Sequence, residues 1–320
     1  MCMDSAFGTT MLGSRVPSPN LFDALIRQCQ EQEPIPVAVC WPCSDVSLLG
    51  ALEAAVARLI QPRLVGSERE IRELANSLDF NLESYEIINV ECEEEAAIRC
   101  TELCRSGSAK ALMKGSLHTD LLMRSVLRKE GGLRTSRRVS HVFIMEAPLY
   151  ERPLLITDAA INIYPSLEDK IDIVQNAIDL AHILGNPLPK VAIMSAIETV
   201  NPKIISTIDA AALCKMAERG QITGAILDGP LAFDTAVNGE AARLKHLQSP
   251  VAGNADILIV PDLESGNMLA KQLEYLGGAR LAGIVLGARV PIILTSRADS
   301  AKSRVASSAV ASRLVYSSVH

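Results

Sequence analysis

The chain has 320 residues and a hydrophobic content of 48%, which exceeds one ordinary core and suits two α/β lobes with a central cleft between them. It carries 31 basic and 37 acidic side chains, a formal net charge of -6, so no global field favours nucleic acid or an anionic membrane as a partner. An anionic ligand must therefore be bound by arginines placed locally.

Residues 1–20 mix Ser, Thr, Gly and Pro without periodicity and are expected to form a flexible arm. Beyond them, short apolar runs alternate with amphipathic stretches, the pattern of an α/β protein. The elements predicted for the first part of the chain are strands at 36–40, 62–66, 86–90 and 111–113, and helices at 48–59, 68–78, 93–106 and 121–127. Strands that alternate with helices of roughly ten or more residues pair in parallel, with helices on both faces of the sheet. A doubly wound first lobe is therefore predicted.

The pattern restarts after the Gly131-Gly132 break. The predicted elements are a hairpin-like pair of strands at 140–145 and 154–158, strands at 191–194, 224–228, 257–260 and 282–285, and helices at 167–184, 210–219 and 266–276. The terminal segment 291–315 supplies one strand and one helix, too little for a third domain, so it must complete an existing sheet. We predict a first α/β domain of residues 21–139 with 288–320 and a second of residues 140–287.

The eight cysteines are too sparse for a disulfide scaffold and show no framework spacing, so we expect free thiols in a reducing compartment. No signal-like segment opens the chain, and no stretch approaches the roughly 18 apolar residues of a membrane span. A soluble cytoplasmic protein is expected. Cys40-Trp41-Pro42-Cys43 is a CxxC pair, but no second pair completes a zinc site, and a strand-to-helix turn is the simpler interpretation. No metal site is predicted.

Several common enzyme fingerprints are missing from the sequence. GxGxxG does not follow the first strand, and GxxxxGK[ST], GxSxG and HExxH do not occur. These absences disfavour a P-loop kinase, an ordinary nicotinamide dehydrogenase, an α/β hydrolase and a zinc protease.

The closing run 292–300 ends an apolar strand with Ser296, Arg297 and Asp299. A hydroxyl, a fixed cation and a carboxylate thus meet at the carboxyl end of a strand, where open α/β sheets build ligand sites. The run predicts a site for an anion.

A second candidate site is the loop that follows the strand at 111–113. Its glycine, hydroxyls and amides at a helix N-terminus are suited to bind an oxyanion, whose charge nearby cations can neutralise. The residues concerned are Lys114, Gly115, Ser116, His118, Thr119 and Arg124. The alternative is that Thr119 and Asp120 only cap the helix. A lone histidine in a polar loop is more often a hydrogen-bonding residue than a catalyst.

A group of arginines, Arg134, Arg137 and Arg138, has two interpretations. It is either a solvated turn or a clamp that holds a phosphate of a bulky ligand through bidentate contacts.

Five segments in the range 35–300 keep the order of motifs of a known family. They are MKGSLHT at 113–119, LITDAAIN at 155–162, DGPLAFD at 228–234, VAGNADILIVPDLESGN at 251–267 and TSR at 295–297. With them the chain resembles the phosphate acetyltransferase and phosphate butyryltransferase family. The form Thr-Ser-Arg-Ala-Asp-Ser at 295–300 is similar to the butyryltransferase-like branch, whereas acetyl-specific members continue from Ser-Arg into Gly-Cys-Ser.

This resemblance implies a two-lobe α/β subunit, shaped like isocitrate and isopropylmalate dehydrogenases, that forms a homodimer through its second lobe. It implies reversible transfer of a short acyl group between coenzyme A and inorganic phosphate, without metal or cofactor. Coenzyme A is then a substrate, and acyl-coenzyme A, inorganic phosphate and acyl phosphate are the small-molecule partners. The thiol attacks the acyl phosphate directly, so no cysteine need act as nucleophile.

The resemblance also implies roles for individual residues. Arg297 is expected to bind the phosphoryl group, Ser296 to hydrogen-bond the thiol or the oxyanion, and Asp299 to act as base, unless it only orients Arg297. Arg124 is expected to share the phosphate from the opposite wall. The other expected substrate-binding residues are Lys114, Gly115, Ser116, His118, Thr119, Asp158, Asn162, Asp262, Asn267, Arg137 and Arg138.

Three other interpretations remain open at this point. One is a metal- and NAD-dependent dehydrogenase of similar fold, for which Asp228, Asp234 and Asp262 are dispersed candidate ligands. Another is a non-catalytic module that binds acyl-coenzyme A or phosphate. The last is a fragment of a longer enzyme fused to a further acyl-coenzyme A domain.

Overall fold

The computed structural model describes residues 20–296 and 299–317. The predicted arm, apart from Asn20, and the predicted phosphate ligand Arg297 lie outside these residues. The strands of the described part are β1 (Ile35–Cys40), β2 (Ile60–Gly66), β3 (Glu86–Asn89), β4 (Ala111–Lys114), β5 (Ser140–Glu146), β6 (Leu154–Thr157), β7 (Lys190–Met194), β8 (Ile226–Leu231), β9 (Ile257–Ile259), β10 (Arg280–Leu286) and β11 (Ile292–Ile293). Its helices are α1 (Leu21–Gln30), α2 (Asp45–Val56), α3 (Glu68–Ser77), α4 (Glu93–Arg105), α5 (Thr119–Val126), α6 (Leu167–Ile183), α7 (Ile205–Glu218), α8 (Phe233–Val237), α9 (Gly239–Leu244), α10 (Leu263–Tyr275) and α11 (Ala301–Ser317).

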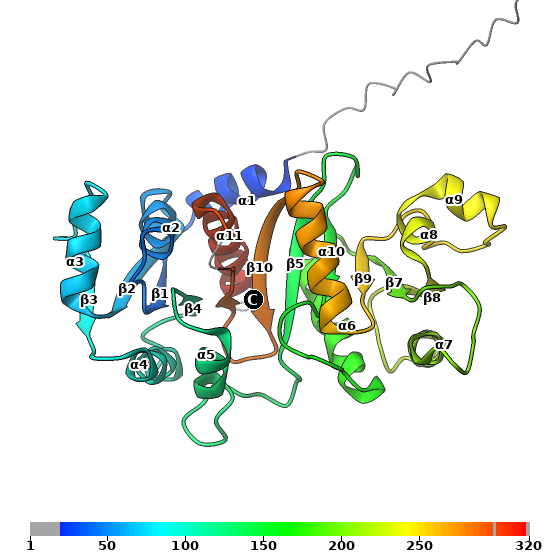
Figure 1. Ribbon diagram of the computed structural model, residues 1–320, viewed down its shortest axis with the longest axis horizontal. Helices are drawn as coiled ribbons and strands as arrows, with labels where there is room; N and C mark the ends of the chain where they lie inside the picture. Colours follow the sequence, from blue (N-terminus) through cyan, green and yellow to red (C-terminus); the bar gives the residue numbers. More distant parts are fainter. Residues whose placement is uncertain (1–19, 297–298, 318–320) are drawn as a thin grey trace, which may run out of the picture.

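The strands lie in one mixed sheet of order β3-β2-β1-β4-β11-β10-β5-β6-β9-β7-β8, which runs the length of the molecule (Figure 1). One parallel sector comprises β3, β2, β1, β4 and β11, and a second comprises β6, β9, β7 and β8. Antiparallel pairing of β10 with β11 and β5, and of β5 with β6, joins the two sectors. The predicted α/β class, the parallel first part and the hairpin-like pair are confirmed. The strands of the two predicted lobes nevertheless share one sheet, and the predicted domain boundaries stay a prediction.

The terminal segment completes the sheet as predicted, because β11 is inserted between β4 and β10. Three helices were not predicted. One of them, α1, buries Phe22, Leu25 and Cys29, and the Cys29 thiol donates a hydrogen bond of 3.4 Å to the Ala309 carbonyl in α11. The others are the short α8 and α9. Another difference is the start of α10, three residues before the predicted one, because the Asp262 carboxylate accepts the backbone N–H of Ser265 at 2.8 Å and caps the helix.

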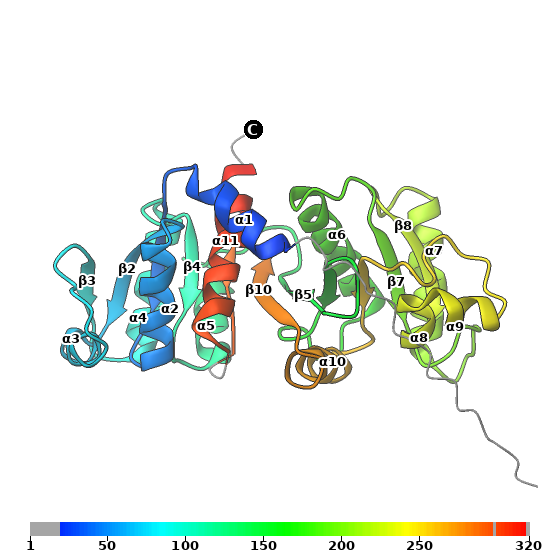
Figure 2. The ribbon, with the colours of Figure 1, turned by 90° about the horizontal axis from the view of Figure 1, so that it is seen from above.

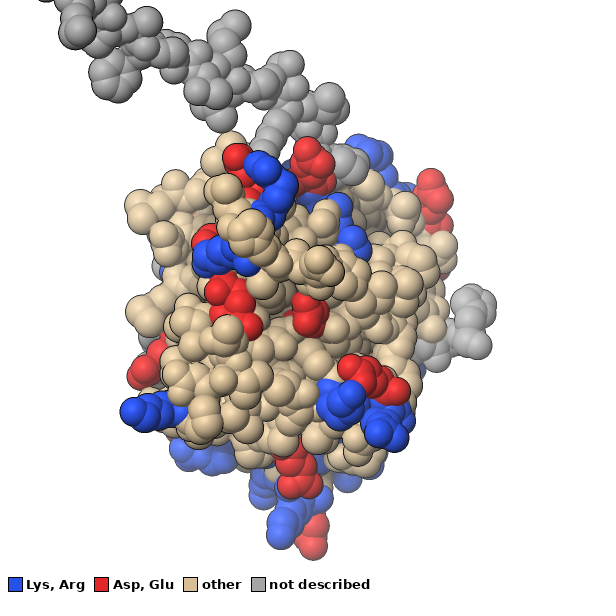
Figure 3. Space-filling view, turned by 90° about the vertical axis from the view of Figure 1, so that its right-hand side faces the viewer, with Lys and Arg blue, Asp and Glu red and all other residues tan. Residues whose placement is uncertain are grey.

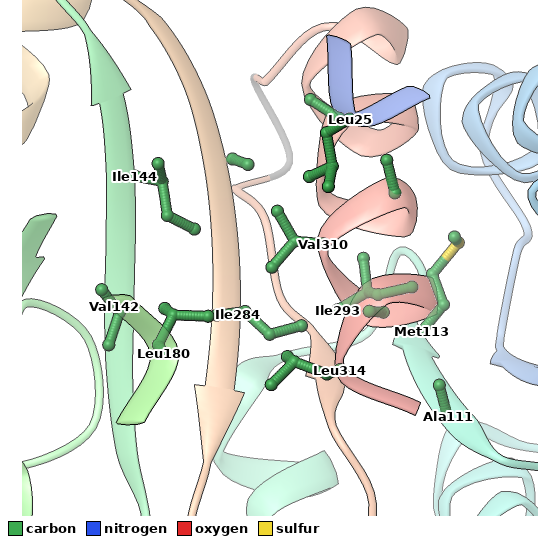
Figure 4. Close-up of a cluster of buried hydrophobic side chains, with 14 of the residues drawn as sticks. Leu25, Ala111, Met113, Val142, Ile144, Leu180, Ile284, Ile293, Val310 and Leu314 are labelled. Atoms are coloured by element: carbon green, nitrogen blue, oxygen red, sulfur yellow. The ribbon is translucent and has the colours of Figure 1, made fainter. Parts of the chain in front are cut away.

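The two faces of the sheet are covered differently. On one face, side chains of α1, α2, α3, α6, α7 and α11 form a single hydrophobic cluster that runs across both sectors. Figure 4 shows its centre, where Leu25, Val310 and Leu314 lie over Ile284 and Ile293. On the other face, α4 and α5 cover one cluster, and α8, α9 and α10 cover a separate one. Figure 2 shows α6 and α10 on opposite sides of the central strands. The helix layer on this second face is therefore interrupted between α5 and α10.

Replacing Ile284 tests how far the single cluster stabilises the fold. Ile284 is fully buried in β10, opposite Val142 of β5 and Ile293 of β11. We expect Ile284→Ala to lower the free energy of unfolding by about 2–5 kcal/mol and Ile284→Val by about 0.5–1.5 kcal/mol, since the larger deletion leaves a larger cavity. Chemical denaturation measures both values. Equal, small losses would show that the centre of the sheet is loosely packed.

Candidate active site

A cavity of about 460 Å³ lies where the helix layer is interrupted. Its lining residues come from both parallel sectors and include parts of both sites predicted from the sequence. They are Lys114, Leu117, His118, Thr119, Phe143, Ala160, Leu263, Asn267, Lys271, Leu294, Thr295 and Ser296. Two other cavities, of about 510 and 610 Å³, are larger, but none of the residues predicted for the site lines either of them.

Strand pairing explains why the two predicted sites meet. β11 lies parallel to β4, with Ile292 opposite Leu112 and Ile293 opposite Met113. The loops that leave the carboxyl ends of these neighbouring strands consequently lie side by side. Lys114 is the last residue of β4, and Ser296 lies in the loop after β11. The cavity therefore lies at the edge of the sheet where a ligand site was predicted.

The loop after β4 is held tightly against the end of β1. The N–H of Gly115 donates to the Cys40 carbonyl at 2.8 Å, and the N–H and hydroxyl of Ser116 both donate to the Trp41 carbonyl at 2.9 Å. A Cβ at Gly115 would stand 2.3 Å from the Trp41 carbonyl oxygen, so only glycine fits here. The hydroxyl of Ser116 thus fixes the loop and does not line the cavity.

The CxxC segment is a turn that supports this loop. Cys40 is fully buried, Cys43 is partly buried, and both are free thiols. Burial raises the pKa of the Cys43 thiol to about 12, so little reactive thiolate exists near neutral pH.

The start of α5 brings two predicted residues to the cavity. His118 is the residue before the helix, it makes no capping hydrogen bond through its side chain, and it is exposed. Thr119 is the first helical residue, so the alternative that Thr119 and Asp120 only cap the helix is wrong. Arg124 is exposed in the last turn of α5 and is not among the lining residues. The expected role of Arg124 in binding phosphate stays a prediction.

The turn after β11 is held by three charged side chains. Asp299 is fully buried, and its carboxylate accepts the backbone N–H of Ser296 at 2.7 Å and pairs with the Lys271 ammonium at 2.8 Å. Arg304, which is 1% exposed, donates to the carbonyls of Asp299 at 2.8 Å and Ser296 at 3.1 Å. Among the described residues, both oxygens of Asp299 thus have protein partners.

Lys271 and Arg304 were missed by the sequence analysis. Lys271 lies one helical turn after Asn267 in α10, and both line the cavity. That spacing places the two side chains on one face of the helix, so the specific motif at 251–267 contained a usable signal. Arg304 gave none, because its partners belong to a turn whose shape the sequence does not reveal.

The pKa of Lys271 is raised. Partial burial acts to lower it, but hydrogen bonds to Asp299 and Glu274 outweigh burial. Lys271 is therefore a persistent cation in the wall of the cavity, and its ammonium is unsuited to accept a proton.

Asp158 and Asn162 hold the loop after β6 and do not line the cavity. The Asp158 carboxylate accepts the N–H groups of Ala160 at 2.9 Å and Ile161 at 3.0 Å, and the side-chain amide of Asn162 at 2.6 Å. That amide also donates to the Val139 carbonyl at 2.9 Å. These bonds place Ala160 at the cavity, so the two residues act on the site through the backbone.

Arg137 and Arg138 are bound to acidic residues of α6. Arg137 pairs with Asp179 at 2.8 Å, and Arg138 pairs with Asp169 at 2.9 Å. Neither arginine lines the cavity. In this structure the two arginines form surface ion pairs, and their expected role in binding a phosphate stays a prediction.

The motif at 251–267 builds the first turn of α10. Asp262 caps the helix, and the side-chain amide of Asn267 donates to the Ala159 carbonyl at 3.2 Å. Asn267 lines the cavity and Asp262 does not. Within the described residues, no three His, Cys, Asp or Glu side chains gather closely enough to hold a metal ion. No helix in the described ranges is both long and apolar enough to cross a membrane.

Comparison with known proteins finds relatives that are described as phosphate acyltransferases. Residues 91–312 match a family model described as Phosphate acetyl/butaryl transferase. A phosphate acetyltransferase of Rhizobium meliloti is 57% identical over 92% of this chain and 93% of the relative. A phosphate butyryltransferase of Clostridium beijerinckii is 41% identical over 91% of this chain and 96% of the relative.

Solved structures extend the comparison to the fold. A branched-chain phosphotransacylase from Enterococcus faecalis V583 matches with a TM-score of 0.77 and 31% identity, over 88% of this chain and 99% of that chain. A 4-hydroxythreonine-4-phosphate dehydrogenase from Klebsiella pneumoniae matches with a TM-score of 0.53 and 10% identity, over 88% of this chain and 100% of that one. The latter supports the fold alone, and the expected dehydrogenase-like α/β fold is confirmed.

The close approach at Gly115 can be tested by adding one methyl group. Gly115→Ala places its Cβ 2.3 Å from the Trp41 carbonyl oxygen, and backbone must move to relieve the contact. We expect the free energy of unfolding to fall by roughly 1–3 kcal/mol. Gly239→Ala is the matched control, because nothing lies within 4 Å of its Cβ position. Denaturant titration of both variants decides; equal stabilities would contradict the packing described for Gly115.

Proposed function

The chain belongs to the phosphate acetyl/butaryl transferase family and is an acyltransferase that moves an acyl group between coenzyme A and phosphate, and we propose that the cavity between α5 and α10 is its active site. One observation carries this proposal. The loops after β4 and β11, which hold two of the family's motifs, meet at one cavity with α10, whose first turn belongs to a third motif.

In the proposed reaction the coenzyme A thiol attacks the carbonyl carbon of an acyl phosphate. A C–S bond forms, the bond between the carbonyl carbon and the phosphate oxygen breaks, the thiol proton passes to a base, and phosphate leaves. We propose that Ser296 hydrogen-bonds the thiol or the developing oxyanion and that Arg297 binds the phosphoryl group. Lys114 and Asn267 supply further positive charge and hydrogen bonding in the cavity wall. Asp299 remains a candidate base.

Acetyl is the proposed acyl group. The expectation of a butyryltransferase-like member rested on residues 295–300, but the identity of 57% to the acetyltransferase exceeds the 41% to the butyryltransferase. The apolar wall formed by Leu117, Phe143 and Leu294 is buried and is suited to enclose a short chain.

A homodimer in the cytoplasm is the proposed assembly. Free thiols at the seven described cysteines fit a reducing compartment. Figure 3 views the end of the molecule formed by the second parallel sector, where a broad uncharged area separates scattered charges of both signs. Ile205 of α7 and Leu244 of α9 are 68% and 66% exposed. Exposed apolar side chains such as these two suit association with a second subunit.

Release of free thiol from acyl-coenzyme A tests the function directly. We expect release from acetyl-coenzyme A that requires inorganic phosphate, with kcat/KM falling from acetyl to propionyl to butyryl, because the apolar wall limits the chain. Release without phosphate would indicate a thioesterase instead. A butyryl preference would overturn the acetyl assignment while leaving the transferase activity intact.

The roles of Ser296 and Arg297 are tested by removing each side chain. We expect Ser296→Ala to lower kcat roughly 10-fold or more without abolishing coenzyme A binding, since one polar contact in the transition state is lost. Arg297→Ala should lower kcat/KM at least ~100-fold through loss of charge-assisted bonds to the phosphoryl group. Ser312→Ala, at a buried hydroxyl in α11 outside the cavity, is the control. Near-normal turnover in folded variants would exclude these roles.

A further inference from the structure

Lys271 lines the cavity, and its ammonium group forms ion pairs with two carboxylates. Its Nζ lies 2.8 Å from Oδ1 of Asp299 and 2.9 Å from Oε2 of Glu274, and the ring centroid of Tyr275 is 5.5 Å away. An ammonium group has three N–H donors. Two point to these carboxylates, and the side chain is still 28% exposed in a residue that lines the cavity. Among residues 20–296 and 299–317, Lys271 Nζ hydrogen-bonds only these two carboxylates, so a third donor can serve a ligand.

Asp299 and Glu274 fix the position of the Lys271 ammonium and leave it able to bind an anion. Asp299 is fully buried, and a buried carboxylate is costly unless it is paired. Lys271 provides that pairing, so its position is fixed by the need to compensate Asp299. The short contact to Glu274 within the same helix restrains the flexible lysine stem further. A restrained ammonium loses less conformational entropy on binding an anion than a free surface lysine does.

Asp299 also connects Lys271 to the reacting region. Its other oxygen accepts the backbone N–H of Ser296 at 2.7 Å. One carboxylate thus sets the distance between Lys271 and Ser296. A ligand oxygen that contacts Lys271 therefore belongs to the part of the substrate beside Ser296, rather than to the distant phosphates of coenzyme A.

We propose that Lys271 is a substrate-binding residue that donates a hydrogen bond to a phosphoryl oxygen of acyl phosphate or inorganic phosphate, and that Asp299 is the positioning residue that holds it. This inference rests on the proposed function. Lysine is a common point-charge ligand for phosphate. The role needs no proton transfer to or from Lys271, in agreement with its persistent charge.

The test measures initial rates of thiol release from acetyl-coenzyme A while phosphate and acetyl-coenzyme A are varied separately. For Lys271→Met we expect the KM for inorganic phosphate to rise at least ~10-fold, the loss of one charge-assisted hydrogen bond, while the KM for acetyl-coenzyme A changes less than ~2-fold. Lys271→Arg, which keeps the charge, should restore at least part of the phosphate affinity. An unchanged KM for phosphate in folded Lys271→Met overturns the proposal.

Lys245→Met is the matched control. Lys245 is also held by two carboxylates, Glu198 at 2.9 Å and Asp234 at 3.0 Å, but it lies just after α9, outside the cavity. It should leave both KM values unchanged. A rise in the KM for phosphate as large as that of Lys271→Met would mean that loss of charge anywhere has this effect, and would overturn the proposal.

A double-mutant cycle tests the positioning role of Asp299. If Asp299 acts on phosphate through Lys271, the KM for phosphate in Lys271→Met/Asp299→Asn should match that of Lys271→Met alone. If the KM for phosphate in the double variant instead rose by the product of the increases in the two single variants, this positioning role of Asp299 would be contradicted. Phosphate-induced stabilisation against thermal unfolding gives a second readout that does not need turnover, and in Lys271→Met it should require phosphate concentrations at least ~10-fold higher than in the wild type. A wild-type enzyme without phosphate-dependent release would refute the proposed function, whereas an active wild type with an unaffected Lys271→Met refutes only this inference.

Discussion

The antiparallel pairing of β10 with its two neighbours holds the molecule together at its centre. β10 pairs with β5 from Arg280 opposite Glu146 to Leu286 opposite Ser140, and on its other edge with β11. Through these ladders the two parallel sectors share one sheet, and their cores on one face merge into a single cluster. The cavity depends on this connection, since its lining combines loops after β4 and β11 with α10 from the other sector.

The unequal cover of the two faces decides where a ligand can bind. On the face with a single hydrophobic cluster, α11 and α6 continue the helix layer across the antiparallel centre. On the other face, the clusters under α5 and α10 remain separate, and polar side chains reach the gap from strand ends. The fold thus combines a closed face that stabilises the subunit with an open face on which the proposed active site lies.

Much of this organisation was predictable, because it depends on the periodicity of apolar residues and on where polar residues stand relative to the strand ends. Alternating apolar runs predicted the strands, and the carboxyl end of a strand predicted the positions of Lys114 and Ser296. Residues whose partners are distant in sequence were not predictable in the same way. Arg137 and Arg138, for example, pair with acidic residues of α6. The contacts of Asp158 are local, but they depend on the conformation of the loop after β6, which the sequence does not reveal. α1 was not predicted, although its buried positions Phe22, Leu25 and Cys29 follow a helical spacing that the sequence contains.

The hydrogen bonds from Arg304 to the carbonyls of Ser296 and Asp299 affect the electrostatics of the open face. Carbonyl oxygens carry partial negative charge, and those of Ser296 and Asp299 would repel an incoming anion if they pointed toward it. Both are instead bonded to one guanidinium that is 1% exposed and belongs to α11, the helix of the opposite face. These two carbonyl oxygens are therefore hydrogen-bonded within the protein interior. Arg304 does not line the cavity, yet it would favour the anion of the proposed reaction, because it holds two partly negative oxygens in hydrogen bonds.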